Sequence, residues 1–172
     1  GQSIGLDIGT SSVRVVRLRK EKDRIILDTY GEVALGPYGG LKIGQAIHLG
    51  EEKLIEAIND LFKEAKVTAR DAVVAIDPSG GYVSLVHVPK VSDEELRTMI
   101  PIEARKYIPI PLTEVQMDWW HIPETVKFSG DEKMTSVVLA AVSNTSLTSY
   151  NSLVKKLELK NVEYEIHGYS LL

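Results

Sequence analysis

Apolar and polar residues follow two different periods in the first part of this chain. Residues 3–8 form a short apolar run that ends in a small-residue turn at residues 9–12. Residues 13–18 and 25–33 continue as two more strands around a charged turn. From residue 51 to residue 65 the apolar positions recur every three or four residues, which predicts an amphipathic helix. This part therefore predicts three strands followed by one helix.

The second part of the chain contains further strands and two helices. Four apolar runs have the length and β-branched content of strands: residues 72–76, 82–88, 115–122 and 136–142. Ser92 and Glu95 have the capping-box spacing that starts a helix. Pro101 falls inside this helix and predicts a kink or a break. A second amphipathic helix starts at Ser146, and residues 162–166 form the closing strand.

The order of these elements predicts a domain with an insertion. Without its middle, the chain reads three strands, helix, strand, helix, strand, which is typical of the α/β ribonuclease-H-like fold, with residues 136–142 as the fourth strand. We therefore expect a core of residues 1–69 and 134–172 and an inserted small α+β unit of residues 70–133. The chain lacks an initial methionine and stops within an element pattern, so we expect a fragment of a longer protein.

Composition narrows the function classes. The 172 residues are 44% hydrophobic and 26% charged, which is an ordinary globular balance. A formal net charge of -4 gives no broad basic field, so we expect no nucleic-acid partner. The absence of cysteine fits a reducing compartment and excludes thiolate chemistry. The four histidines show no metal-ligand spacing, and no apolar stretch is long enough to span a membrane.

The segment with the clearest chemistry is the first strand and its turn. Asp7 ends an apolar strand, where a carboxylate can hold Mg²⁺ through its waters. Gly9, Thr10, Ser11 and Ser12 follow, and a turn of small residues lets backbone N–H groups approach a phosphate. The alternative is that the same residues only make a favourable hairpin turn. The apolar strands on both sides favour the phosphate site.

This segment resembles the first phosphate loop of the actin-like ATPase superfamily, which includes actin, the seventy-kilodalton heat-shock proteins, sugar kinases and FtsA. Residues 137–144, with the helix and strand that follow, resemble the next elements of the first domain of those proteins. The resemblance implies that the full-length protein binds ATP and Mg²⁺, whereas this part alone binds them poorly. The family position beside the hydrolytic water corresponds to His167, so we expect weak or no ATPase activity.

A second resemblance narrows the family. Residues 103–112 read E-A-R-K-Y-I-P-I-P-L, and they are preceded by a lysine-containing turn and an acidic helix start at residues 89–96. With residues 115–119, this pattern resembles the N-terminal half of the PilM family of type IV pilus assembly proteins, in the FtsA/PilM branch. Ile110 stands where that family usually has phenylalanine, and Pro101 where it has a helix-compatible residue.

The resemblance to the PilM family implies a role in pilus biogenesis. The core corresponds to an incomplete subdomain 1A and the insert to subdomain 1C of the actin-like fold. The implied function is a cytoplasmic scaffold, peripheral to the inner membrane through its partners. Those partners are the cytoplasmic tail of a PilN-like inner-membrane protein and other platform proteins, with a homo-oligomer as a further candidate. The alternatives are an FtsA-like filament protein, a type II secretion platform protein and a phosphotransferase of the sugar-kinase type.

The same segment suggests where a partner binds. Pro109 and Pro111 hold the chain extended, so we expect Tyr107, Ile108 and Ile110 to be exposed beside a sheet and to form one wall of a groove for the PilN-like tail. The alternative is that Tyr107 and Ile108 close the core of the insert.

Overall fold

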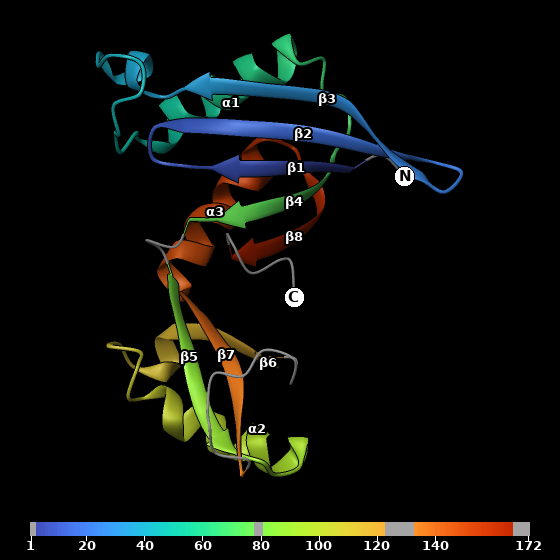
Figure 1. Ribbon diagram of the computed structural model, residues 1–172. Coiled ribbons are helices and arrows are strands. Elements are labelled where there is room, and N and C mark those ends of the chain that lie inside the picture. Colours follow the sequence, from blue (N-terminus) through green and yellow to red (C-terminus); the bar gives the residue numbers. More distant parts are fainter. Residues whose placement is uncertain (1–2, 78–80, 123–132, 167–172) are drawn as a thin grey trace. The chain divides into compact units, whose positions relative to one another are not determined.

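The computed structural model describes residues 3–77, 81–122 and 133–166 (Figure 1). Its main elements are β1 (Ser3–Ile8), β2 (Ser12–Glu21), β3 (Arg24–Ala34), α1 (Glu51–Glu64), β4 (Asp71–Ile76), β5 (Gly81–Pro89), α2 (Asp93–Ala104), β6 (Val115–His121), β7 (Met134–Ser143), α3 (Asn144–Lys156) and β8 (Lys160–Ile166). Short 3₁₀ turns, η1 (Gly36–Gly39) and η3 (Leu112–Glu114), follow β3 and precede β6. The chain divides into two compact units, one holding the described residues up to Asp77 and from Ser149 onward, and one holding those between them.

The first unit contains a five-stranded sheet in the order β3-β2-β1-β4-β8 (Figure 1). β1, β2 and β3 are antiparallel neighbours. β4 runs parallel to both β1 and β8. Three antiparallel strands followed by two parallel crossovers give the sheet order of the ribonuclease-H-like fold, as predicted.

One face of this sheet carries the core of the first unit. Alternate residues of the strands are buried there, including Leu6, Val15 and Val74, because side chains of a strand point to opposite faces in turn. They form one apolar cluster with residues of α1 and α3, such as Ile58 and Leu153. Both helices therefore cover the same face, and the opposite face of the sheet is free of them.

The second unit contains a three-stranded antiparallel sheet in the order β5-β7-β6. α2 packs its buried residues Leu96 and Ile100 against one face of that sheet, where Val86 and Leu139 are also buried. The predicted capping box starts α2: Ser92 Oγ accepts a hydrogen bond from the Glu95 backbone at 3.3 Å, and the Ser92 N–H donates to Glu95 Oε2 at 3.0 Å.

The predicted boundaries of the insert are wrong at both ends. β4, which we placed in the insert of residues 70–133, is the fourth strand of the five-stranded sheet. β7, which we placed in the core as residues 136–142, is the central strand of the three-stranded sheet. Both runs are apolar, so their own patterns do not say which neighbour they pair with. The described residues of the second unit begin after Asp77 and continue into the first residues of α3.

Pro101 does not break α2, so the break is excluded, whereas the kink stays a prediction. The helix continues from Asp93 to Ala104 with Pro101 inside it. Proline leaves the carbonyl four residues earlier, that of Arg97, without its usual helical donor. Arg97 is exposed, so water can satisfy this carbonyl, and only one turn of helix follows the proline.

Candidate nucleotide-phosphate site

Two carboxylates lie at the same edge of the five-stranded sheet. β1 and β4 are parallel neighbours, with Asp7 opposite Ala75, so both strands end at that edge. Asp77 follows directly after β4. Ligands of open α/β sheets bind outside the carboxyl ends of their strands, and this edge therefore brings Asp7 and Asp77 to the usual place.

Asp7 lies on the sheet face that the helices leave free, with 30% of its side chain exposed. In the register it stands opposite Arg14, whose Nη1 approaches Asp7 Oδ2 at 3.6 Å. Arg14 also donates from Nε to Glu32 Oε1 at 3.1 Å, so it bridges two carboxylates. Asp7 is thus solvent-accessible enough to meet a hydrated cation, and Arg14 offsets part of the negative charge.

The turn after β1 is fixed by one hydrogen bond within it and by two from later segments of the chain. The Gly9 N–H donates to the Ser12 carbonyl at 3.0 Å, which closes the turn. The Thr10 carbonyl accepts from the Ile47 N–H at 2.9 Å, and the Ser11 carbonyl accepts from the Leu35 N–H at 2.9 Å. A Cβ on Gly9 would lie 3.0 Å from the Ser12 carbonyl oxygen, so glycine permits this tight closure. A turn held this way is preorganised before any ligand arrives.

The Ser12 side chain already has a role in this arrangement. Its hydrogen bond is the largest cause that lowers the pKa of Glu32, and the nearby Arg14 charge and Tyr30 hydroxyl lower it further against the desolvation of the carboxylate. Glu32 therefore stays ionised at neutral pH. Because the Ser12 hydroxyl is hydrogen-bonded to Glu32, backbone N–H groups of the turn are better candidates for phosphate contacts than this side chain.

Asp77 is held in place from α3. Its backbone N–H donates to the Tyr150 hydroxyl at 3.2 Å. Burial is the largest cause that raises the pKa of Tyr150; the charges of Asp77 and Asp7 add to it, and the hydrogen bond from the Asp77 backbone opposes it. Tyr150 is therefore neutral at physiological pH, and it lies near enough to both carboxylates for their charges to raise its pKa.

Sequence reasoning missed Asp77 and Tyr150. Asp77 fell in a Pro- and Gly-containing turn, and Tyr150 is one of several apolar positions on its helix face. The available signal for Asp77 was an acidic residue directly after a buried strand, the same signal that identified Asp7. His167, the predicted position beside the hydrolytic water, lies outside the described residues.

The oxygen-rich edge fits a hydrated Mg²⁺ bound with phosphates. Mg²⁺ keeps several waters and uses one or two carboxylates, which Asp7 and Asp77 can supply. Within residues 3–77, 81–122 and 133–166, no group of three or more His, Cys, Asp or Glu side chains is placed to hold a metal ion. The described residues therefore do not form a site in which protein side chains alone surround the metal ion.

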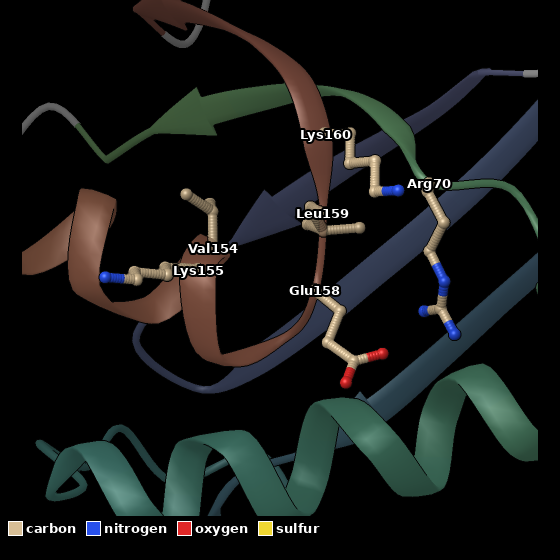
Figure 2. Close-up of a pocket in the computed structure, with 6 residues that line it drawn as sticks. All are labelled: Arg70, Val154, Lys155, Glu158, Leu159 and Lys160. Atoms are coloured by element: carbon tan, nitrogen blue, oxygen red, sulfur yellow. The ribbon is translucent and has the colours of Figure 1, made fainter.

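A concave region lies at the starts of β4 and β8, the opposite end of these strands from Asp77 (Figure 2). It is lined by Arg70, Val154, Lys155, Glu158, Leu159 and Lys160 and has a volume of about 500 Å³. Arg70 and Lys160 enter from the starts of their strands, and the Arg70 carbonyl accepts from the Lys160 N–H at 2.7 Å. Figure 2 shows the Glu158 carboxylate on the same side as the Arg70 guanidinium, while the Lys155 side chain points away from both. The mixed charges favour no single ligand class.

The second unit has its own pocket of about 420 Å³, lined by Asp93, Arg97, Asp118, Trp119, Trp120 and His121. His121 Nε2 lies 2.9 Å from Asp93 Oδ1, at the start of α2. The rings of Trp119 and His121 meet edge to face, with centroids 5.4 Å apart. These contacts tie the end of β6 to the helix.

The three predicted partner residues do not share one environment. Ile108 is 5% exposed and belongs to the apolar core of the second unit, so the expectation that it is exposed is wrong. Ile110 is partly buried against the same core. Tyr107 is 41% exposed. The alternative that this segment closes the core of the insert thus holds for Ile108, and a docking surface can include only Tyr107 and the outer side of Ile110.

None of the described helices is both long and apolar enough to cross a membrane.

Comparison with known proteins places the chain in a family. It matches the family model for type IV pilus assembly protein PilM over residues 5–171. A solved PilM–PilN type IV pilus biogenesis complex is similar, with a TM-score of 0.71 and 23% identity over 95% of this chain and 46% of that chain. The cytoplasmic domain of EpsL, an inner-membrane component of the type II secretion system of Vibrio cholerae, matches with a TM-score of 0.57 and 17% identity over 95% of this chain and 56% of that chain. The chain spans about half the length of these structures. With the sheet order, the matches confirm the predicted actin-like α/β fold.

Proposed function

The chain belongs to the PilM family of type IV pilus assembly proteins, and we propose that it forms the nucleotide-binding front half of a scaffold in the pilus assembly platform. The family match over residues 5–171 supports the pilus role. The observation that carries nucleotide binding is the cluster of Asp7 and Asp77 beside the fixed turn of residues 9–12. The proposed subdomains are 1A for the five-stranded unit and 1C for the three-stranded unit.

In this proposal the turn holds the phosphates of ATP and the carboxylates hold the waters of Mg²⁺. Bound Mg²⁺ would neutralise phosphate charge that the two carboxylates would otherwise repel. Thr10 and Ser11 supply backbone N–H groups, Gly9 closes the turn by donating its own N–H to the Ser12 carbonyl, and Ser12 holds Glu32 in place through its hydroxyl. ATP binding is expected to exceed turnover, so the nucleotide acts as a structural ligand.

The proposed partner is the cytoplasmic tail of a PilN-like inner-membrane protein. A solved structure of the same fold is a PilM–PilN complex, which supports this choice. Tyr107 is exposed and Ile110 is partly exposed beside Pro109 and Pro111, so an extended apolar peptide can contact this segment with little loss of chain entropy. The scaffold would then lie in the cytoplasm, peripheral to the inner membrane, where other platform proteins could join it.

Titration of the full-length protein tests both parts of the proposal. Calorimetry with ATP should show binding that requires Mg²⁺ and disappears when the metal is chelated. A peptide of the PilN tail should bind the wild type, and Ile110→Asp should weaken that binding. Because Ile110 packs partly against the core, the variant should also melt at a lower temperature, so the titration is made below its melting transition, where it is folded. Ile102→Asp is the matched control, because Ile102 is 64% exposed on α2 of the same unit. Equal peptide affinity for wild type and Ile110→Asp, or equal losses in both variants, would refute the proposed surface.

The family match also bears on the alternatives. It favours the pilus platform over a filament protein, a type II secretion protein and a sugar kinase. The likeness to the EpsL domain is a likeness of fold. ATP-dependent phosphorylation of a sugar by the full-length protein would contradict the scaffold.

A further inference from the structure

The β2–β3 hairpin extends beyond the rest of the five-stranded sheet. β3 is an edge strand of that sheet (Figure 1). The described part of β1 begins at Ser3, opposite Leu18, whereas β2 and β3 continue to the turn after Glu21. Within the described residues, the hairpin beyond Leu18 therefore has no third strand beside it, and the outer side of β3 is unpaired.

Four large apolar side chains are exposed on one face of this hairpin. They are Leu18 at 48%, Ile25 at 74%, Leu27 at 60% and Tyr30 at 59% exposure. The register places Leu18 directly beside Leu27, on the sheet face that α1 and α3 leave free. A free edge strand with exposed apolar side chains is a template for pairing with another chain, and proteins usually blunt such edges.

The backbone of the edge is free at Ile25 and Leu27. Glu21 and Arg24 close a two-residue turn, so they form a hydrogen-bonded pair. Residue pairs along an antiparallel ladder alternate between hydrogen-bonded and non-hydrogen-bonded. The N–H and C=O groups of Ile26 therefore point toward β2, and those of Ile25 and Leu27 point toward the free edge. A second strand can therefore bond at Ile25 and Leu27.

The extra residue at Asp28 limits which register such a strand can take. Arg17 pairs with Thr29 and Leu18 pairs with Leu27, so Asp28 is an additional residue in β3. A bulge bends the strand and interrupts regular pairing. The regular free edge is thus the segment of residues 24–27, in which Ile26 stands midway between the two open positions Ile25 and Leu27.

This segment is complementary to itself. When two copies pair antiparallel about Ile26, Ile25 of each stands opposite Leu27 of the other, so both open hydrogen-bonding positions meet. Arg24 of each copy then stands opposite Asp28 of the other. Asp28 already contacts Arg17 Nη2 at 2.5 Å through Oδ2 and Arg19 Nε at 3.5 Å through Oδ1, and each carboxylate oxygen has a second lone pair for a further donor.

We propose that the free edge of β3 pairs antiparallel with the same edge of a second copy of this chain, with the two-fold axis at Ile26. Cross-strand neighbours on the exposed face then form two continuous apolar rows, each of Leu18 and Leu27 from one copy and Ile25 from the other. Such a self-complementary contact closes as a dimer. Pairing over so few residues buries far less than a stable interface of about 1,200 Å², so the dimer forms at micromolar to millimolar concentration.

Charge reversal provides a test that is specific to this register. Arg24→Asp alone places two aspartates opposite each other, and Asp28→Arg alone places two arginines opposite each other, so each variant of the full-length protein should be monomeric. An equimolar mixture restores both ion pairs and should dimerise like the wild type in analytical ultracentrifugation. Lys20→Asp is the matched control, because Lys20 lies on β2 opposite Ile25 and away from the free edge. It should dimerise.

A wild type that stays monomeric from micromolar to millimolar concentration would overturn the proposal. So would a mixture of the two variants that remains monomeric, or a loss of dimer in Lys20→Asp equal to that in the charge-reversal variants. Asp28→Arg also removes the contacts with Arg17 and Arg19, so circular dichroism must show that each variant is folded. Leu27→Pro keeps the test decisive if Asp28→Arg unfolds, because the Leu27 N–H faces the free edge and not β2. It should abolish the dimer while the melting curve shows a folded protein, and a folded Leu27→Pro dimer would refute the pairing.

Discussion

Replacement of Asp7 by alanine should separate nucleotide binding from folding. Asp7 is partly exposed, and its ion pair with Arg14 spans 3.6 Å on the surface. Such pairs contribute at most about 1 kcal/mol to the free energy of unfolding. The melting temperature of the variant should therefore fall by no more than about 4 °C for a domain of this size.

The effect on ATP should be larger than the effect on stability. Asp7 is proposed to accept hydrogen bonds from the waters of Mg²⁺, and hydrogen bonds to a charged group contribute about 1.5–3 kcal/mol each. Loss of one such bond raises the dissociation constant for Mg²⁺-ATP roughly tenfold to a hundredfold. Isothermal titration of the full-length protein with Mg²⁺-ATP measures this change directly.

Asp71→Ala is the matched control for Asp7→Ala. Asp71 begins β4 at the opposite end of the same sheet, where its Oδ1 accepts from Asn161 Nδ2 at 3.0 Å. Its removal deletes one carboxylate of the sheet but leaves the proposed site intact, so ATP affinity should stay at the wild-type value. Equal ATP affinity of folded Asp7→Ala and wild-type protein would exclude Asp7 from the site.

Three further predictions concern the turn and α2. Gly9→Ala should weaken Mg²⁺-ATP binding in calorimetry, because its Cβ would lie 3.0 Å from the Ser12 carbonyl oxygen and open the turn; unchanged affinity would contradict a role for the turn. Ser92→Ala should lower the free energy of unfolding by about 0.5–2 kcal/mol in denaturant titration. The backbone N–H of Ser92 and, next, its hydroxyl lower the pKa of Glu95, so the stability that the ionised Glu95 contributes is present above the usual pKa of 4.5 and is lost as the pH falls through the lowered pKa. Ser92→Ala keeps the backbone donor and should weaken this acid dependence only in part, whereas Glu95→Gln should abolish it; a Glu95→Gln variant with the wild-type acid dependence would refute the link. Pro101→Ala should stabilise the helix by up to about 3 kcal/mol in the same assay, and a destabilised variant would show that the proline is needed for packing.

The sequence by itself determined individual helices and strands and the part of the site formed by Asp7 and the turn after it. The helical period of residues 51–65 predicted α1 within one residue, and the Ser92–Glu95 spacing predicted the start of α2. Asp7 and the turn after it were found because a carboxylate and small residues at the end of an apolar strand are a local signal. Each of these features depends on residues within a few positions of one another.

Only the tertiary structure decided which strands share a sheet. β4 is buried on one face and joins the five-stranded sheet, whereas β7 is buried along most of its length and lies at the centre of the three-stranded sheet. A strand's own pattern records how much of it is buried but not which strand pairs with it, because backbone hydrogen bonding between strands is independent of side-chain identity. For the same reason two features follow from long-range pairing that no local pattern encodes. They are the placement of Asp7 and Asp77, which are far apart in the chain, at one edge of a sheet, and the burial of Ile108 in the core of its unit.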